Sequence, residues 1–411
     1  MSSTGSTDHA PAADGIAATA REGAESVYRY VARTAERVPD GVRWRTLSYE
    51  NQPQYDLSVF NGVAGISAFL ATYYHLTGDE QALDLALGAA RWCARPERLR
   101  EGSVEEWRQD GLFRGRAGVG MACLRLAEVT GDRALLQPAL EIAERLREKG
   151  PSPVTDVLDG AAGEGIYLVR FAEATGQEAA LAGAVRIGEW LAQTVIRDER
   201  GTYWPWEVGS QEYGQWYGLS FAPGLAGIGY FLLLLYALTQ DGRWADLARE
   251  VGETLARHAR LDHGGLNWPD TLDETELRCQ WCNGAPGVGL FFVKAYDVLG
   301  DPASLRTAEA AGETTYQYGD VRRNPVQCHG LAGQGELLLD LYRSSRDRRW
   351  LERAHHFAQL ALAYRTVTAE GDVWQADDPG YSSPDFMCGA SGTGHFFLRL
   401  WQPDRVSRPF L

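Results

Sequence analysis

The sequence predicts an all-α protein whose helices form an α/α toroid of about seven hairpins. Three observations predict this fold class. A G-x-x-G phrase recurs seven times, an apolar stretch of helical length follows each phrase, and most of these stretches lead through a turn into a more amphipathic helix. The phrases begin at Gly62, Gly115, Gly160, Gly224, Gly284, Gly330 and Gly389.

The elements of one repeat can be justified in chain order. After Gly62, the apolar residues Ile66, Phe69, Leu70 and Tyr73 are spaced as on one face of a helix. The Thr-Gly-Asp turn that follows supplies a glycine for the C-cap of this helix and an aspartate for the N-cap of the next one. The predicted unit is therefore a glycine phrase, an inner apolar helix, a turn and an outer amphipathic helix.

Two features favour a closed ring over an open solenoid such as a HEAT array. The inner stretches are apolar nearly all round, as expected for helices that are enclosed on both sides. The glycines fall at the N-termini of these helices, where the backbones of a closed ring approach one another, whereas a solenoid does not need glycine at one fixed place in every repeat. We expect a single toroid domain over residues 21–411, after a disordered tail over residues 1–20.

The composition excludes some partners. The chain has 40 Lys and Arg residues against 55 Asp and Glu residues, a net charge of -15, which disfavours nucleic acid and anionic membranes. Residues 219–238 are uncharged and long enough to span a bilayer, but Pro223 and several glycines interrupt them, which favours a buried helix. No signal peptide pattern is visible and the six cysteines are scattered, so a cytoplasmic protein is expected.

Closing the ring gathers the residues that precede each phrase around a common axis, which we call the hub. The residues immediately before each first glycine are Asn61, Arg114, Asp159, Pro223, Asn283, His329 and Cys388. One position earlier, Cys282 and Cys328 occupy equivalent places in consecutive repeats. Their thiols are therefore expected to meet, with His329 beside them.

Two thiolates and one imidazole form a favourable ligand set for one Zn²⁺. Three protein ligands with an open fourth position are typical of a catalytic zinc. The alternatives are a structural zinc completed by Cys388 or Cys279, and metal-free packing of the cysteines. Because a Cys₂His site carries net negative ligand charge, it suits a substrate thiol better than water, and a thiol bound there loses its proton but stays nucleophilic.

The stretches "QWCNGAPGVGL" (residues 280–290) and "CHGLAGQGE" (residues 328–336), set in seven glycine repeats, resemble the lanthionine cyclase family of LanC and LanC-like proteins. The resemblance covers the chain from about Gly62 to His395, and it implies an α/α toroid that binds zinc through the Cys₂His set. It also implies that a Cys thiol of a dehydrated precursor peptide adds to dehydroalanine or dehydrobutyrine, which forms lanthionine or methyllanthionine. Since seven repeats already occupy 411 residues, dehydration is expected from a separate dehydratase or kinase/lyase partner.

The resemblance assigns further site residues. Catalytic roles fall on Asp156 in "DVLDG" and on Arg278 in "RCQWC". Each has a plainer alternative: Asp156 caps a helix, and Arg278 pairs with Asp156 or Glu276 and only holds the hub together. The aromatic-rich loop over residues 201–220 is expected to bind substrate or, alternatively, to pack over the end of the toroid. The residues expected to contact substrate are Trp204, Trp206, Trp216 and Asn283.

Two positions depart from the family pattern. Pro223 stands where many bacterial members have a His that transfers a proton, and Asn283 stands where they often have a Tyr. The groups that could replace this His are the side chains of Cys388, Asp159, Tyr217 and His395, or a bound water. Of these, His395 is better explained as a core histidine. Alternatively, a second dehydroalanine traps the enolate, or the protein is a noncatalytic zinc-containing scaffold for the precursor peptide or for a dehydratase or kinase partner.

Two other enzyme classes built on helical toroids are disfavoured. A prenyltransferase-like enzyme usually has a carboxylate as its third zinc ligand, whereas this hub offers Cys, Cys and His. A glycosidase needs a pair of carboxylates, and the hub contains no clear motif of that kind.

Overall fold

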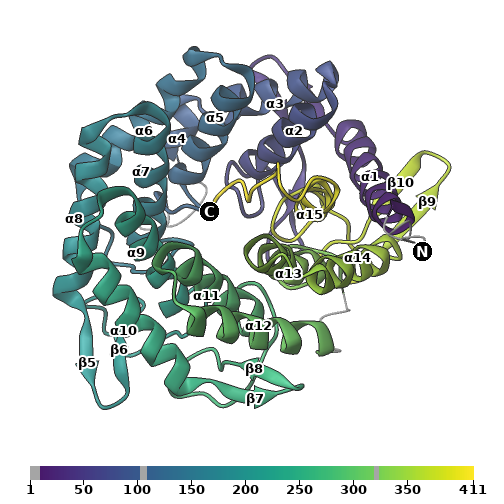
Figure 1. The fold of residues 1–411 in the computed structure, drawn as a ribbon. Coiled ribbons are helices and arrows are strands. Elements are labelled where there is room, and N and C mark those ends of the chain that lie inside the picture. Colours follow the sequence, from purple (N-terminus) through teal and green to yellow (C-terminus); the bar gives the residue numbers. More distant parts are fainter. Residues whose placement is uncertain (1–9, 102–108, 319–323) are drawn as a thin grey trace, which may run out of the picture.

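The computed structural model describes residues 10–101, 109–318 and 324–411, and it confirms the α/α toroid (Figure 1). Seven inner helices each begin directly after the first glycine of a phrase. They are α2 (Val63–Thr77), α5 (Arg116–Thr130), α7 (Ala161–Thr175), α9 (Leu225–Thr239), α11 (Ala285–Leu299), α13 (Leu331–Ser345) and α15 (Ala390–Trp401).

The outer helices pair with the inner ones as antiparallel hairpins. They are α3 (Glu80–Cys93), α6 (Leu136–Lys149), α8 (Glu178–Thr194), α10 (Gly242–His258), α12 (Pro302–Gln317), α14 (Arg348–Leu362) and α1 (Ala10–Arg33). In the described part of the chain, the short helix α4 (Pro96–Glu101) lies between the first two repeats, and the 3₁₀ turn η2 (Arg133–Leu135) joins α5 to α6 within the second.

Helix α1 closes the ring, because it packs against α15 as the outer member of the seventh hairpin (Figure 1). The predicted disordered tail is therefore wrong for residues 10–20, which begin this helix, while residues 1–9 lie outside the described residues. The physical reason is burial: Ile16 and Ala20 already face the interior, so the helix is held by packing against the ring.

The turns between inner and outer helices have the predicted chemistry. Gly78 ends α2 in the left-handed conformation with a φ of 70°, and the Asp79 carboxylate accepts hydrogen bonds from the backbone N–H groups of Gln81 and Ala82. Asp301 caps α12 in the same way.

The second glycine of each phrase allows close backbone contact. At Gly65 an added Cβ would collide with the carbonyl oxygen of Val59, and at Gly333 it would collide with that of Gln327. The same contact, with the carbonyl six residues earlier, occurs in all seven phrases. This steric requirement explains why the phrase repeats so regularly.

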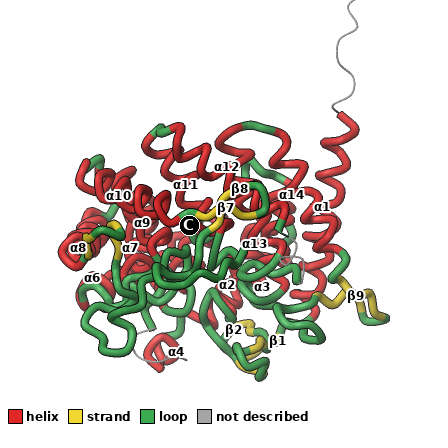
Figure 2. The backbone as a smooth tube through the Cα atoms, turned by 90° about the horizontal axis from the view of Figure 1, so that it is seen from below, coloured by secondary structure: helices red, strands yellow, loops and turns green. Residues whose placement is uncertain are grey.

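The loops that precede the inner helices, which we call the hub loops, bind one another around the axis. Their backbone N–H groups donate to the carbonyl of the next loop, as follows: Met387 to Phe60 (3.0 Å), Phe60 to Phe113 (2.8 Å), Phe113 to Leu158 (3.0 Å), Ala222 to Cys282 (3.1 Å), Trp281 to Cys328 (3.1 Å) and Cys328 to Met387 (2.8 Å). Figure 2 shows these loops gathered at one end of the ring. The predicted register of the repeats therefore holds in three dimensions.

Five antiparallel two-stranded ribbons complete the fold, and the sequence analysis did not predict them. They are β1 (Glu36–Val38) with β2 (Gly41–Arg43), β3 (Thr46–Leu47) with β4 (Pro53–Gln54), β5 (Ile196–Asp198) with β6 (Gly201–Tyr203), β7 (Arg260–Asp262) with β8 (Gly265–Asn267), and β9 (Arg365–Thr368) with β10 (Gly371–Trp374). Four of these ribbons directly follow an outer helix. Trp44 follows β2, and its indole N–H donates to the carbonyl of Val31 in the preceding helix, which fastens the ribbon to the ring.

The centre of the toroid is packed rather than open. The C-terminal end of the described chain lies inside the ring (Figure 1), where Phe410 contacts the rings of Phe113 and Phe386 edge-on. The apolar stretch over residues 219–238 corresponds to a hub loop and inner helix α9, as expected. Among the described residues, no helix combines the length and hydropathy that a bilayer span requires.

Candidate metal centre

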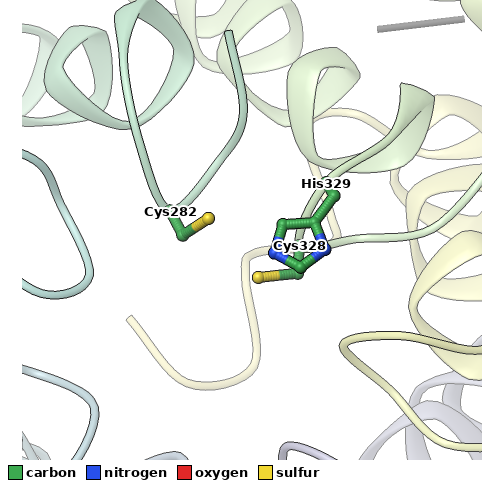
Figure 3. Close-up of side chains that lie close together, drawn as sticks. All are labelled: Cys282, Cys328 and His329. Carbon is green, nitrogen blue, oxygen red and sulfur yellow. The ribbon is translucent and has the colours of Figure 1, made fainter. Parts of the chain in front are cut away.

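Two neighbouring hub loops bring the predicted zinc ligands together. Cys282 precedes α11, and Cys328 and His329 precede α13; one ligand atom from each lies within 4.8 Å of the other two. Figure 3 shows both thiols and the imidazole directed into one common space. The Trp281 N–H that donates to the Cys328 carbonyl fixes the two loops side by side. The repeat register therefore predicted this cluster correctly.

A carboxylate that the sequence analysis missed orients the histidine. Asp377 Oδ2 lies 2.6 Å from Nδ1 of His329, and Asp377 Oδ1 accepts a hydrogen bond from the side chain of Asn324 at 2.8 Å. With Nδ1 engaged, Nε2 is left as the ligand atom of the ring. Asp377 lies outside the glycine phrases, so the repeat register gave no signal for it.

The electrostatics of the cluster fit a cation. A hydrogen bond with Cys328, and then the positive charge of His329, lower the pKa of Cys282 to about 5. Burial alone would lower the pKa of His329, but the Cys282 thiolate and Asp377 raise it to about 10. Burial raises the pKa of Cys328. A divalent cation bound by these three groups would displace any protons that they carry.

The other cysteines differ in their distance from this centre. Cys388 lies beside it, because its ligand atom is within 4.8 Å of those of His329 and Asp377. Its backbone N–H donates to the Asp385 carboxylate at 2.8 Å, and burial raises the pKa of its thiol. Cys279 belongs to neither ligand group and lies against Thr315. Of the two residues considered for completing a structural zinc site, only Cys388 lies near the cluster, and it groups with His329 and Asp377 rather than with Cys282 and Cys328.

The opposite side of the hub is charged instead of sulfur-rich. Asp156 is buried, accepts hydrogen bonds from the Asp159 N–H (2.8 Å) and from the Trp206 indole, and has a pKa raised by burial. The Asp159 carboxylate lies 3.3 Å from the guanidinium of Arg114. Asp156 therefore holds its own hub loop and an aromatic side chain in place. The alternative role as a helix cap is wrong, because the N-cap position of α7 is Gly160 and no side chain caps it.

Arg278 has a partner that was not foreseen. It pairs with Asp270 at 3.2 Å, so the expected pairing with Asp156 or Glu276 is wrong. Asp270 is buried, and this burial raises the pKa of its carboxyl to about 6 against the opposing charge of Arg278. The Asp270 carbonyl accepts the N–H of Leu219, which places this residue beside the hub loop of Pro223.

Of the remaining predicted residues, Asn283 contacts a cysteine of the cluster, whereas Trp206, Trp216 and Tyr217 contact other aromatic side chains. Asn283 donates a hydrogen bond to Sγ of Cys282 at 3.6 Å, and Trp206 contacts Trp216 at 6.5 Å between ring centroids. Tyr217, by contrast, packs edge-on against Tyr203. Pro223 follows a cis peptide bond at the hub position of the fourth repeat, where it offers no titratable group.

Burial corrects the prediction for Trp204 and confirms the one for His395. Trp204 is 3% exposed and donates its indole N–H to the Leu191 carbonyl, so it has no surface to offer a peptide. His395 is buried on α15 against Phe386, and burial lowers its pKa to about 3. It is a neutral core histidine, as the plainer interpretation held.

A pocket of about 490 Å³ borders the centre. Its lining includes His329, Asp377 and Arg278, but neither Cys282 nor Cys328. A ligand in this pocket would therefore meet the imidazole and the Asp377 carboxylate rather than the thiols.

Fold and site together define a class of protein: an α/α toroid with a Cys₂His ligand set at the hub. The chain belongs to the lanthionine synthetase C-like family, because the family model described as "Lanthionine synthetase C-like protein" matches residues 53–411. This match confirms the resemblance seen in the glycine phrases.

Individual relatives agree with this assignment. The chain is 29% identical over 203 residues to "Glutathione S-transferase LANCL1" of Danio rerio, covering 47% of this chain and 46% of the relative, so it spans about half the length of that curated protein. Its fold is similar to that of nisin cyclase, with a TM-score of 0.66, 17% identity and coverage of 93% of this chain and 94% of the other. It also resembles cellobiose 2-epimerase from Spirochaeta thermophila, with a TM-score of 0.52, 13% identity and coverage of 97% and 99%. At these identities the structural likeness concerns the fold alone. Family and fold support a cyclase or a LanC-like scaffold.

Proposed function

We propose that this protein is a zinc-dependent cyclase that joins a peptide Cys thiol to a dehydroalanine or dehydrobutyrine residue and so forms a thioether ring. The observation that carries the proposal is the meeting of Cys282, Cys328 and His329 at the hub, where His329 also lines a pocket. Zinc held there would lower the pKa of a coordinated thiol and keep it nucleophilic at neutral pH.

The reaction is balanced without a further reactant. The thiol sulfur bonds to the β-carbon of the dehydroamino acid, the π electrons of the C=C bond move onto the carbonyl oxygen, and the α-carbon then takes up one proton. The proton released by the thiol and the proton gained by the α-carbon cancel. The substrate must arrive already dehydrated, so a separate dehydratase or a kinase/lyase has to act before this protein.

The proton that the α-carbon takes up must come from a donor group, and Pro223 has none to offer. Asp159 is held in an ion pair with Arg114, and Tyr217 packs against Tyr203. Asp270 suits the role better, because it lies beside the loop of Pro223 and its Oδ1 receives no hydrogen bond from a described residue. Cys388 at the metal centre is the other group in place.

An alternative function is a noncatalytic zinc-containing scaffold that binds the precursor peptide or a dehydratase or kinase partner. The observation that favours it is Pro223, which removes the histidine that transfers protons in many relatives. The two functions differ in one measurable respect, which is whether the protein accelerates loss of the peptide thiol.

The test is an assay on a purified dehydrated peptide that contains one Cys, with the free thiol followed by alkylation and mass spectrometry. We expect thiol loss and stoichiometric zinc for the natural chain, and loss of both for Cys328→Ala. Cys123→Ala, at a buried cysteine of α5, is the matched control and should retain both. Equal thiol loss with the natural chain and with Cys328→Ala would rule out the cyclase and leave the scaffold.

The same assay tests Asp270. Asp270→Asn keeps the size of the side chain and, because Asp270 is not a metal ligand, should retain zinc while cyclisation slows. A rate equal to that of the natural chain would exclude Asp270 as the proton source.

A further inference from the structure

Arg114 is a hub cation that the proposed chemistry has not yet used. It occupies the position immediately before the first glycine of the second repeat, which is the position of His329 and Cys388 in their repeats. The backbone hydrogen bonds between hub loops order these repeats around the ring, from the loop of Arg114 through those of Asn61 and Cys388 to that of His329. Arg114 therefore lies across the hub from the metal centre.

The contacts of Arg114 fix the position of its guanidinium, but they do not engage all of its N–H donors among the described residues. Nη1 lies 3.3 Å from the Asp159 carboxylate, and Nη2 donates to the Tyr49 hydroxyl at 2.9 Å. Its Cζ atom lies 4.9 Å from the ring centroid of Phe60 and 5.2 Å from that of Tyr49. Nε is buried and has no hydrogen-bond partner among the described residues. Of the five N–H donors of arginine, one on Nη1 and one on Nη2 are engaged and the Nε–H is buried, so one N–H on each Nη is left without a described partner.

The positive charge of Arg114 also influences groups on the sulfur side of the hub. Burial raises the pKa of Cys388, and Arg114 acts against this rise. Burial likewise raises the pKa of Tyr49; Arg114 lowers it, while Cys328 and the other hub thiols raise it further. Tyr49, Arg114 and the thiols thus share one electrostatic environment, which a substrate bound at the hub would enter.

Addition of a thiolate to a dehydroamino acid at the hub requires that a developing negative charge be stabilised. Negative charge develops on the carbonyl oxygen next to the C=C bond, and fixed hydrogen-bond donors in a water-poor site stabilise such an oxyanion strongly. Arg278 is less suited to this task, because its side chain is 48% exposed to water. The side chain of Arg114 is 20% exposed.

We propose that Arg114 donates hydrogen bonds to the carbonyl oxygen of the dehydroamino acid and stabilises the enolate that forms when the thiolate attacks the β-carbon. The inference rests on the proposed cyclase function and deepens it. The electron pair that leaves the C=C bond resides on the oxygen facing Arg114 until the α-carbon takes up its proton. Arg114 keeps its own proton throughout, because a guanidinium is not a proton donor at neutral pH.

The structural alternative is that Arg114 only neutralises Asp159. Three variants separate the two roles. Arg114→Gln removes the charge and most donors, Arg114→Lys keeps the charge on a shorter donor, and Asp159→Asn removes the ion pair but leaves the guanidinium. Each is compared with the natural chain on the same dehydrated Cys peptide, with zinc content, thermal midpoint, KM and kcat measured.

If Arg114 stabilises the enolate, Arg114→Gln loses about 10²- to 10³-fold in kcat while zinc content and KM stay close to those of the natural chain. Arg114→Lys recovers part of the loss, and Asp159→Asn loses much less than Arg114→Gln. The inference is overturned by an unchanged kcat in Arg114→Gln, by equal losses in Arg114→Gln and Asp159→Asn, or by loss of folding or zinc in both charge-removing variants. An inactive natural chain would instead overturn the proposed function, and this inference with it.

Discussion

The two sides of the hub share one backbone geometry but differ in chemistry. On one side, the loops of Cys282, Cys328 and Cys388 present sulfur, and on the other, the loops of Arg114 and Asp159 present charge. Both sets of loops have the same glycine contacts and the same pattern of hydrogen bonds to their neighbours. The comparison teaches that the glycines build the ring, whereas the two residues before each phrase determine the reactivity of each position.

The largest effect on zinc affinity from a residue outside the ligand set is expected on the sulfur side, at Asp377. In Asp377→Asn the side chain can no longer hold His329 through a carboxylate, so zinc affinity should fall by about 10- to 100-fold. Competition with a zinc chelator measures this directly and does not depend on cyclase activity. Asp378→Asn, at the exposed neighbouring residue, is the control. Unchanged zinc affinity in Asp377→Asn would mean that the carboxylate does not orient the ligand.

The next prediction concerns the pH dependence of the free energy of unfolding. It is expected to depend on Glu164 of α7, an inner helix on the charged side of the hub. Burial raises the pKa of this carboxyl to about 7, against the opposing charge of Lys149. The folded state therefore favours the protonated form, and this contribution to stability is complete below the unfolded pKa of about 4.5 and is lost as the pH rises through about 7. We expect the free energy of unfolding to fall by on the order of 2 kcal/mol over this window.

Urea denaturation at several pH values checks this prediction. Glu164→Gln should flatten the dependence between pH 4.5 and 7, whereas Glu173→Gln, on the same helix but part-exposed, should leave it in place. An identical pH dependence in Glu164→Gln and the natural chain would show that Glu164 is not the group responsible.

The smallest effect is expected where the repeats differ only in a cap. Asp79 and Gln177 have nearly the same backbone conformation before their helices, with φ and ψ of -71° and 105° against -79° and 106°, but only Asp79 accepts capping hydrogen bonds. Asp79→Ala should cost about 1 kcal/mol of unfolding free energy, and Gln177→Asp should recover a comparable amount at its own helix. Neither change should alter zinc content, because both lie in the scaffold. A change in zinc content with either variant would show that residues of the scaffold also affect the metal centre.

The sequence predicted the fold and the meeting of Cys282, Cys328 and His329 because repetition supplies three-dimensional information. Seven equivalent phrases define equivalent positions around an axis, so Cys282 and Cys328 could be placed together although they lie far apart in the chain. The same reasoning correctly located Pro223 and the hub position of Arg114. Each of these inferences depends on register alone.

Residues outside the phrases could not be placed in this way. Asp377 and Asp270 lie in loops that differ from repeat to repeat, so nothing in the register relates them to the hub. The burial of Trp204 depends on a β ribbon whose strands are only three residues long. Helix α1 was not predicted because no glycine phrase precedes it and because its partner α15 is far away in the sequence.

The pairing of α1 with α15 has a consequence for how the protein is made. Helix α1 can pair with α15 only after the helices between them have been synthesised, so this contact has a large sequence separation and should come late in folding. The loops of Cys282 and Cys328 belong to consecutive repeats and can meet in a partial ring. Zinc could therefore be captured by an open arc of helices, and the bound ion would then hold two repeats in register while the rest of the circle is completed.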